Sequence, residues 1–184
     1  IYDLKAIVAN IFARLGISTR EIMLTDGNEE IYSASINIAT RAGKQLGAMG
    51  IVAKAILKKA DIKQEVLFAE LDWNAIVKLS LKKKVTFAPL PKTQPVKRDL
   101  ALLIDKAVTM AQIEAVVRES ERKLLKDVTL FDVYEGKNLP EGKKSYAIAM
   151  TIQDDEKTLQ DKQIEAVMNK IITNLERRLG ASLR

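Results

Sequence analysis

The stretch VTLFDVYEGKNLPEGKKSYAIAMTI, residues 128–152, decides the fold of the second half of the chain. Its first part, Val128 to Tyr134, is rich in β-branched and aromatic residues, and its last part, Ser145 to Ile152, alternates bulky apolar residues with small or polar ones. Both patterns are typical of β-strands. The segment between them contains two glycines and a proline, which favour turns. The sequence therefore predicts a β-hairpin with a long basic loop.

The flanking segments supply the remaining elements of this half. RDLALLID, residues 98–105, is short and apolar enough for a buried strand. Thr109 and Gln112 form a T-x-x-Q capping box, which predicts the start of a helix. A second helix of about five turns is predicted from an apolar stripe at spacings of three and four that ends at Gly180. With a possible short strand over 181–184, the order β-α-β-β-α(β) predicts an α+β, ferredoxin-like sandwich.

In such a sandwich both helices cover one face of the sheet, and strand alternation decides which side chains occupy the other. In the first hairpin strand, alternation places Phe131 and Val133 on one side and Leu130, Asp132 and Tyr134 on the other. In the second strand, the bulky set that we expect to face the helices is Tyr146, Ile148, Met150 and Ile152.

The open face is then expected to carry an aromatic ring (Tyr134), a carboxylate (Asp132) and a hydroxyl (Ser145) beside small residues. Single-stranded RNA is bound by such groups, through stacking on rings and hydrogen bonds to base edges. The alternative is that Tyr134 is an ordinary half-buried strand tyrosine and Asp132 an acid beside a turn.

The sequence of the first half of the chain predicts an antiparallel sheet flanked by helices. An amphipathic helix begins at Tyr2 and ends at Gly16. Further along, the patterns predict strands over 21–25, 31–40 and 66–71 and a helix over 73–79. The glycines between these strands, at positions 43, 47 and 50, do not form a G-x-x-x-x-G-K-[ST] phosphate loop, so we interpret them as turn and close-packing residues.

A basic stretch separates the two halves. Residues 82–98, KKKVTFAPLPKTQPVKR, hold six Lys or Arg residues, no acid and three of the four prolines. This composition predicts a linker over 86–95, between a first part at 1–85 and a domain at 96–184. Its charge fits either a solvated tether or a contact with a polyanion such as RNA.

Composition narrows the function further. The chain of 184 residues is 47% hydrophobic, has a net charge of +6, and contains no cysteine and no histidine. Disulfides, Cys or Ser/His nucleophilic pairs and imidazole chemistry are therefore excluded for this sequence, and no run approaches the ~20 apolar residues of a membrane span. We find no catalytic constellation and expect no metal site. Because the sequence starts at Ile1 without Met, we expect a piece of a longer polypeptide.

Three motifs carry a resemblance to a known family. The strings RDLALLID, LFDVYEGKNLPEGKKSYAIAMTIQDDEKTLQDKQI and LGASLR resemble the C-terminal anticodon-binding domain of bacterial phenylalanyl-tRNA synthetase beta subunits over nearly all of residues 91–184. In the first half, DLKAIVANIFARLGI and AGKQLGAMGIV resemble the catalytic-like module of the same subunit. One departure is the sequence Val52-Ala53-Lys54, where a histidine-proline pair is common in the family.

The resemblance implies a ferredoxin-like domain that reads the anticodon of phenylalanine tRNA. The family's anticodon contacts map to Asp132, which would accept hydrogen bonds from a purine, Tyr134, which would stack on a base, and Ser145, which would add a hydroxyl contact. Weaker candidates, as phosphate contacts, are Lys97, Arg98, Lys143 and Lys144.

For the whole enzyme, the resemblance implies a cytoplasmic ligase that uses ATP and magnesium. An alpha subunit carries the chemistry in an alpha2-beta2 assembly, so this chain is expected to hold no catalytic residue and no cofactor, and no membrane is involved. The rival interpretation is a ferredoxin-like regulatory or dimerisation module that binds a small ligand.

Overall fold

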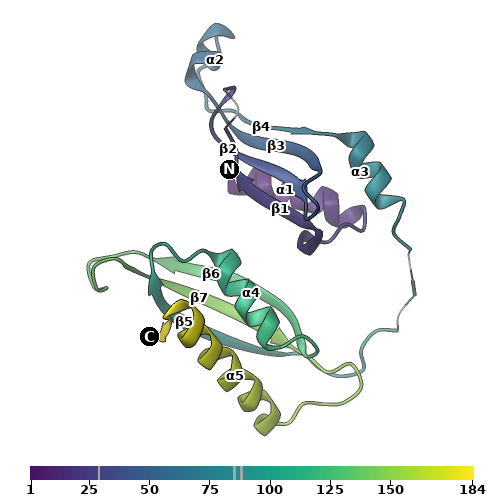
Figure 1. Ribbon diagram of the computed structural model, residues 1–184, viewed down its shortest axis with the longest axis vertical. Coiled ribbons are helices and arrows are strands. Elements are labelled where there is room, and N and C mark those ends of the chain that lie inside the picture. The colour runs from purple at the N-terminus through teal and green to yellow at the C-terminus, as the bar shows by residue number, and fades with distance from the viewer. Residues whose placement is uncertain (29, 85, 88) are drawn as a thin grey trace. The chain divides into compact units, whose positions relative to one another are not determined.

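The chain divides between residues 87 and 88 into two units in the computed structural model (Figure 1). We call them the N-terminal unit, residues 1–87, and the C-terminal unit, residues 88–184. The structure describes residues 1–28, 30–84, 86–87 and 89–184. The predicted linker over 86–95 includes residue 88, which lies outside the described residues, so its bounds stay a prediction.

The N-terminal unit is built on a four-stranded antiparallel sheet in the order β1-β2-β3-β4. Its elements are α1 (Tyr2–Arg14), the short 3₁₀ helix η1 (Thr19–Glu21), β1 (Ile22–Asp26), β2 (Tyr32–Thr40), β3 (Gln45–Val52), α2 (Lys54–Lys59), β4 (Leu67–Leu71) and α3 (Trp73–Ser80). The predicted first helix is confirmed as α1, and Gly16, with φ of +72°, follows its last turn. The three predicted strands and the helix after them are confirmed within two residues of their predicted bounds.

Apolar side chains of α1 and α3 pack on one face of this sheet. Val8 and Phe12 of α1 and Ile76 of α3 are buried against Ile38 and Met49. The other face is shaped by glycine: a Cβ on Gly50 would lie 2.4 Å from the Ala34 carbonyl oxygen on β2. Gly50 is therefore a close-packing residue, as the sequence predicted, but it lies inside the strand β3, which the sequence analysis did not predict, rather than between strands.

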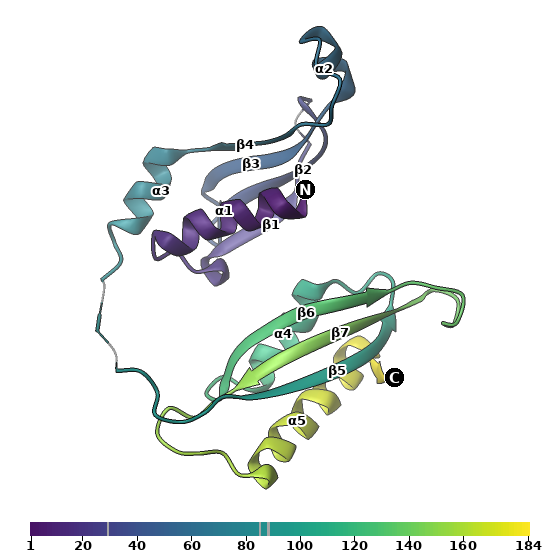
Figure 2. The ribbon, with the colours of Figure 1, turned by 180° about the vertical axis from the view of Figure 1, so that it is seen from behind.

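The C-terminal unit is the predicted ferredoxin-like sandwich. Its elements are β5 (Val96–Asp105), α4 (Met110–Ser120), β6 (Leu125–Tyr134), β7 (Lys143–Ile152), α5 (Asp161–Leu179) and β8 (Ser182–Leu183). The antiparallel sheet has the order β6-β7-β5-β8, and α4 and α5 lie on the same face (Figure 1), so that the view from behind shows the open face (Figure 2). The capping box of Thr109 and Gln112 forms, and Gly180 ends α5 with φ of +60°.

The core lies between this sheet and its two helices. Alternate residues of β5 and β7 face the helices, namely Leu100, Leu102, Ile104, Ile148, Met150 and Ile152. They pack against Ile113, Val116 and Val117 of α4 and Val167, Ile171 and Leu175 of α5. The opposite side chains of the same strands are thereby presented on the open face.

A register shift in β6 corrects one prediction. The shift falls between Leu130 and Asp132, so Leu130 pairs with Ile148 and packs against the core. The prediction that Leu130 shares a face with Asp132 and Tyr134 is therefore wrong. A bulge with one extra residue reverses the alternation before and after it.

The two bulky residues that were expected to be covered by the helices are both exposed. Phe131 is the extra residue of the bulge and is 58% exposed, whereas Val133 pairs with Tyr146 on the helix side, as predicted, but is 49% exposed. The end of the hairpin thus displays apolar side chains that simple alternation assigns to the core.

Candidate nucleic-acid interface

One end of the open face brings together the three residues that the sequence singled out. Tyr134 on β6 pairs directly with Ser145 on β7, and Asp132 pairs with Ala147, the next residue of β7 on that face. Directly paired side chains of an antiparallel sheet lie about 5 Å apart. Ring, hydroxyl and carboxylate therefore form one cluster, which we call the Tyr134 cluster.

The ring of Tyr134 is half-buried and has a cationic neighbour. The guanidinium carbon of Arg184 lies 5.2 Å from the ring centroid, a cation–π distance. Arg184 follows β8, and its backbone nitrogen donates a hydrogen bond of 3.0 Å to the Ala101 carbonyl oxygen of β5. Ser145 is only 5% exposed, so its hydroxyl is largely covered in this arrangement.

Sequence reasoning missed Arg184 as a neighbour of Tyr134. The closing L-R was noted as a motif, but β6 and β8 are the opposite edges of the sheet. Neither the sequence nor the strand order therefore predicts that the Arg184 side chain reaches the ring; the side-chain positions show it. The one sequence signal was the predicted final strand over 181–184, which is confirmed as β8.

Gly136 defines the other boundary of the ring. A Cβ at this position would lie 2.4 Å from the Tyr134 hydroxyl oxygen and 2.5 Å from the ring carbon that bears it. Such distances are shorter than any ordinary van der Waals contact. The absence of a side chain at residue 136 therefore allows the ring its present position.

The four candidate phosphate contacts do not share one place. Lys143 lies on the open face beside the cluster, with its ammonium 3.1 Å from the carboxylate of Asp105, its partner across the strands. Lys144 has the opposite parity and is 7% exposed. Its ammonium lies 3.0 Å from the Tyr146 hydroxyl oxygen and 4.5 Å from the centroid of that ring. The structure thus brings Lys143 to the cluster and Lys144 to the helix side.

Lys97 and Arg98 lie toward the other end of the sheet. They pair with Thr151 and Met150 on β7, and both are exposed. Thr151 is six residues from Ser145 along β7, which corresponds to about 20 Å at the rise of a strand. These two bases are therefore separated from the cluster by most of the sheet.

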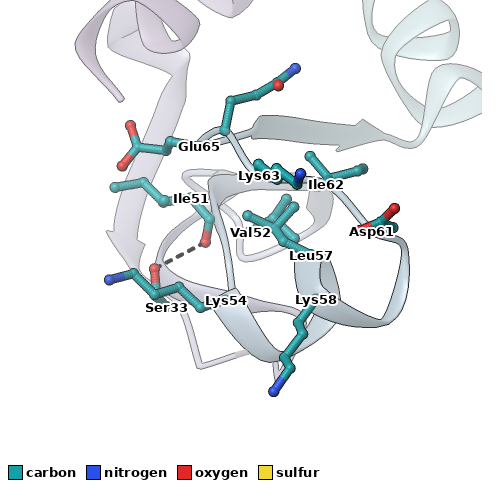
Figure 3. Close-up of a pocket in the computed structure, with 11 residues that line it drawn as sticks. Ser33, Ile51, Val52, Lys54, Leu57, Lys58, Asp61, Ile62, Lys63 and Glu65 are labelled. Carbon is teal, nitrogen blue, oxygen red and sulfur yellow. Dashed lines mark hydrogen bonds between the residues drawn. The ribbon is translucent and has the colours of Figure 1, made fainter.

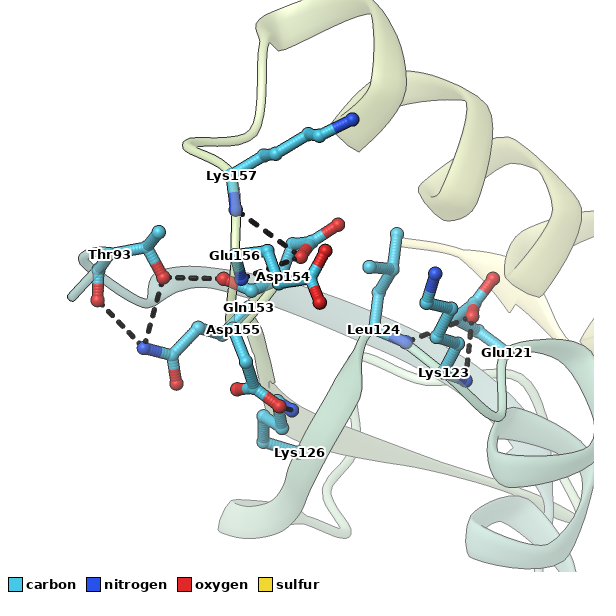
Figure 4. A network of polar contacts seen from close by, with 10 residues as sticks. All are labelled: Thr93, Glu121, Lys123, Leu124, Lys126, Gln153, Asp154, Asp155, Glu156 and Lys157. Carbon is cyan, nitrogen blue, oxygen red and sulfur yellow. Dashed lines mark hydrogen bonds and ion pairs between the residues drawn. The ribbon is translucent and has the colours of Figure 1, made fainter. Parts of the chain in front are cut away.

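The same far end carries a polar network around the loop that follows β7 (Figure 4). The carboxylate of Asp154 accepts hydrogen bonds from the backbone nitrogens of Glu156, at 2.9 Å, and Lys157, at 3.3 Å. The Glu156 hydrogen bond is the main cause that lowers the pKa of Asp154 below its ordinary value. The acids of this loop thus stabilise a turn, and no group of carboxylates in the described ranges could hold a metal ion.

The N-terminal unit has a hollow of about 600 Å³ beside α2 (Figure 3). Val52 and Leu57 lie at its middle, whereas the side chains of Lys54 and Lys58 extend outward. Its Ser33 hydroxyl is already bonded to the Ile51 carbonyl oxygen at 3.3 Å. A ligand site needs polar groups that converge on the ligand, so this hollow is a weaker candidate than the Tyr134 cluster.

Across the part of the chain that the structure describes, we find no helix with the length and apolarity to span a membrane.

Comparison with known proteins assigns both units. Residues 91–184 match the family model of the ferredoxin-fold anticodon binding domain, and residues 1–73 match that of the phenylalanyl tRNA synthetase beta chain CLM domain. Relatives named phenylalanine–tRNA ligase beta subunit are 50% identical in Porphyromonas gingivalis, 47% in Bacteroides fragilis and 33% in Clostridium acetobutylicum, each over 184 residues and the whole of this chain. The chain spans 22 to 23% of the length of these curated relatives.

Proposed function

The chain belongs to the phenylalanyl-tRNA synthetase beta-chain family, with the ferredoxin-fold anticodon-binding domain as its C-terminal unit, and on this premise we propose that this unit reads the anticodon of phenylalanine tRNA. The observation that carries the proposal is the Tyr134 cluster. It lies on a sheet face that neither of the unit's described helices, α4 and α5, covers, and it combines a stacking surface with hydrogen-bonding groups.

Each member of the cluster has a role in this proposal. Tyr134 stacks on an anticodon base, Asp132 accepts hydrogen bonds from the amino or imino group of a purine, and Ser145 adds a hydroxyl contact. Because Ser145 is nearly covered and Arg184 lies over the ring, a base would have to displace the Arg184 side chain to reach both. The released guanidinium is then available to the RNA.

The basic residues have a separate role. Lys143 is the phosphate contact beside the cluster, and Lys97, which has the open-face parity, contacts the backbone of the RNA toward the other end of the sheet. Arg98 is left out of this surface, because it pairs with Met150, a residue that faces the helices. Lys144 is left out of this surface, because its ammonium lies on the helix side against Tyr146.

The test is binding of the 184-residue chain to phenylalanine tRNA and to the same tRNA with an altered anticodon, at two salt concentrations. A preference for the native anticodon that persists at the higher salt supports the proposal, because base contacts release fewer counterions than phosphate contacts. Equal binding of the two tRNAs, weakened equally by salt, would contradict it.

For the complete protein we propose the ligase function that its relatives' name states, with an alpha subunit as partner in an alpha2-beta2 assembly and the cytoplasm as its location. The N-terminal unit would be a non-catalytic interface. In this proposal ATP and magnesium act in the complete enzyme, and Gly47 and Gly50 are not a phosphate loop, because they lie inside β3 rather than before a helix.

A small-ligand regulatory module is the rival that the same binding experiment addresses. The hollow recorded in the C-terminal unit, beside Lys126 and Gln153, has a volume of about 130 Å³, against roughly 300–1,000 Å³ for ordinary ligand sites. It also lies at the far end of the sheet from the Tyr134 cluster. If an amino acid stabilises the chain against unfolding and the chain does not bind RNA, the small-ligand module is favoured.

Gly136→Ala is expected to weaken tRNA binding although residue 136 need not touch RNA. The added methyl group would overlap the ring of Tyr134 and force it to move. We expect a loss of binding smaller than that from removing the ring, with almost unchanged thermal stability, because the end of a side chain moves rather than the backbone. Gly142→Ala is a useful contrast: no atom lies within 4 Å of a Cβ there, although its φ of +78° will cost some stability. Equal affinity of Gly136→Ala and the unaltered chain would argue against the role of the ring.

Lys143→Ala is expected to lower the salt dependence of RNA binding. One phosphate contact to a single strand contributes about 0.7 to the slope of log K against log salt, so the slope should fall by that amount. Lys144→Met, which removes a charge on the helix side, should leave the slope unchanged. Affinity measured at four or more salt concentrations gives both slopes, and identical slopes for Lys143→Ala and the unaltered chain would remove Lys143 from the interface.

A further inference from the structure

The segment that enters the C-terminal unit is held by the loop after β7 (Figure 4). Thr93 lies three residues before β5, and Gln153 directly follows the last residue of β7. The side-chain amide of Gln153 donates a hydrogen bond of 2.7 Å to the Thr93 carbonyl oxygen. In return, the Thr93 hydroxyl donates a hydrogen bond to the carbonyl oxygen of Asp154. Thr93 is thus held on two sides.

The loop that holds Thr93 is itself fixed to the sheet. The backbone nitrogen of Gln153 donates a hydrogen bond of 2.8 Å to the carbonyl oxygen of Leu124, the residue before β6. The Asp154 carboxylate closes the following turn through its two backbone hydrogen bonds, and the ammonium of Lys126 lies 2.8 Å from the carboxylate of Asp155. The partners of Thr93 are therefore part of a local network that includes β6.

The basic stretch is also attached to the N-terminal unit at its other end. The ammonium of Lys83 forms an ion pair with the carboxylate of Glu21, which also accepts a hydrogen bond of 3.0 Å from the Ser18 nitrogen. Three residues earlier, the Ser80 hydroxyl donates a hydrogen bond of 2.8 Å to the Leu15 carbonyl oxygen. The hydrogen bond from Lys83 is the main cause that lowers the pKa of Glu21 below its ordinary value.

From these contacts we propose that Gln153 is a positioning residue that, with the Asp154 carbonyl group, fastens Thr93 and so sets the length of the tether between the units. With Lys83 and Thr93 both fastened, the connecting segment is residues 84–92. Ten Cα–Cα steps from Lys83 to Thr93 extend to about 35 Å at most. Release of Thr93 moves the first fixed residue to Val96 and lengthens this maximum by about 10 Å.

The place of the fastening matters as much as its strength. Gln153 is eight residues from Ser145 along β7, or about 27 Å at the rise of a strand, so the chain enters the unit at the end of the sheet opposite the Tyr134 cluster. The fastened residue, Thr93, is therefore separated from the Tyr134 cluster by the length of the sheet.

Native-state trypsin digestion of the 184-residue chain tests this proposal at the bond between Lys92 and Thr93. Gln153→Glu keeps the size of the side chain and removes the donor, and Thr93→Val keeps the shape and removes the hydroxyl. Each variant is expected to accelerate cleavage of this bond about fivefold, the change in an opening equilibrium that one ordinary hydrogen bond brings. Each cleavage rate is divided by the rate for a synthetic peptide of residues 86–98 with the same residue at position 93, which corrects for the preference of trypsin at that position.

Two matched substitutions and one internal reference complete the test. Thr93→Ser keeps the hydroxyl, and Gln163→Glu makes the same chemical change at a side chain whose oxygen accepts a hydrogen bond from the Gln160 nitrogen. In both variants, trypsin is expected to cleave the bond after Lys92 at the rate found for the unaltered chain. The bond after Lys84 is expected to be cleaved at the same rate in every variant. The proposal is overturned if Gln153→Glu and Thr93→Val leave the Lys92 rate unchanged. It is also overturned if both bonds accelerate equally, because that indicates general loosening. No RNA is present, so the result does not depend on the proposed function.

Discussion

Replacing Tyr134 with alanine should weaken binding of phenylalanine tRNA to this chain by ~1 to 3 kcal/mol, which is about 5- to 150-fold in the dissociation constant. The reason is the loss of a ring on which an anticodon base stacks. Tyr134 is only half-buried and its ring end is bounded by Gly136, so its removal should not unfold the unit. The measurement is a titration of labelled tRNA at constant salt, because salt alone changes such affinities strongly.

Two variants separate stacking from other effects of the substitution. Tyr134→Phe keeps the ring and should bind almost normally. Tyr2→Ala removes a tyrosine that is 81% exposed on α1 of the N-terminal unit and should have no effect. If the affinity of a folded Tyr134→Ala variant for tRNA equals that of the unaltered chain, the ring is not a stacking surface and the Tyr134 cluster is not the anticodon site.

Ile148→Ala should destabilise the C-terminal unit by about 2 to 5 kcal/mol. Ile148 is fully buried in the middle of β7, between the sheet and its two helices, so truncation leaves a cavity. The conservative variant Ile148→Val should cost only about 0.5 to 1.5 kcal/mol. Urea denaturation followed by far-UV circular dichroism, which reports on both units, measures the change.

The same substitution tests whether the two units unfold separately. Trp73, the only tryptophan, lies in α3 of the N-terminal unit, so its fluorescence reports on that unit alone. Ile148→Ala should leave the fluorescence transition in place, whereas Ile76→Ala, at a buried position of α3, should move it. A shift of the fluorescence midpoint by Ile148→Ala as large as the shift of the dichroism midpoint would mean that the units unfold together.

The arrangement of elements was predictable because it depends on local patterns. The spacing of apolar residues distinguishes helices from strands, and the capping box at Thr109 and the glycine at 180 mark helix ends through backbone geometry. The order of elements then restricts the topology to few choices, one of which is the observed β6-β7-β5-β8 sheet. For the same reason, Tyr134 and Ser145 could be assigned to one face without coordinates.

Other features depend on how residues distant in the sequence meet. The bulge at Phe131 could not be predicted, because an extra residue in one strand is defined only by its pairing with the other, and it moved Leu130 to the core. The guanidinium of Arg184 over Tyr134, and the hydrogen bonds between Gln153 and Thr93, join segments that are 50 and 60 residues apart.

The sequence by itself thus determined the elements, their order and the candidate face of the C-terminal unit, since these follow from periodicity and turn chemistry. Only the tertiary structure decided which charged groups reach that face. Lys143 and Arg184 lie beside the ring, Lys144 is buried behind the sheet, and Lys97 is most of a strand length away. The physical reason is that a side chain's neighbours depend on strand register and strand order, which local sequence patterns do not specify.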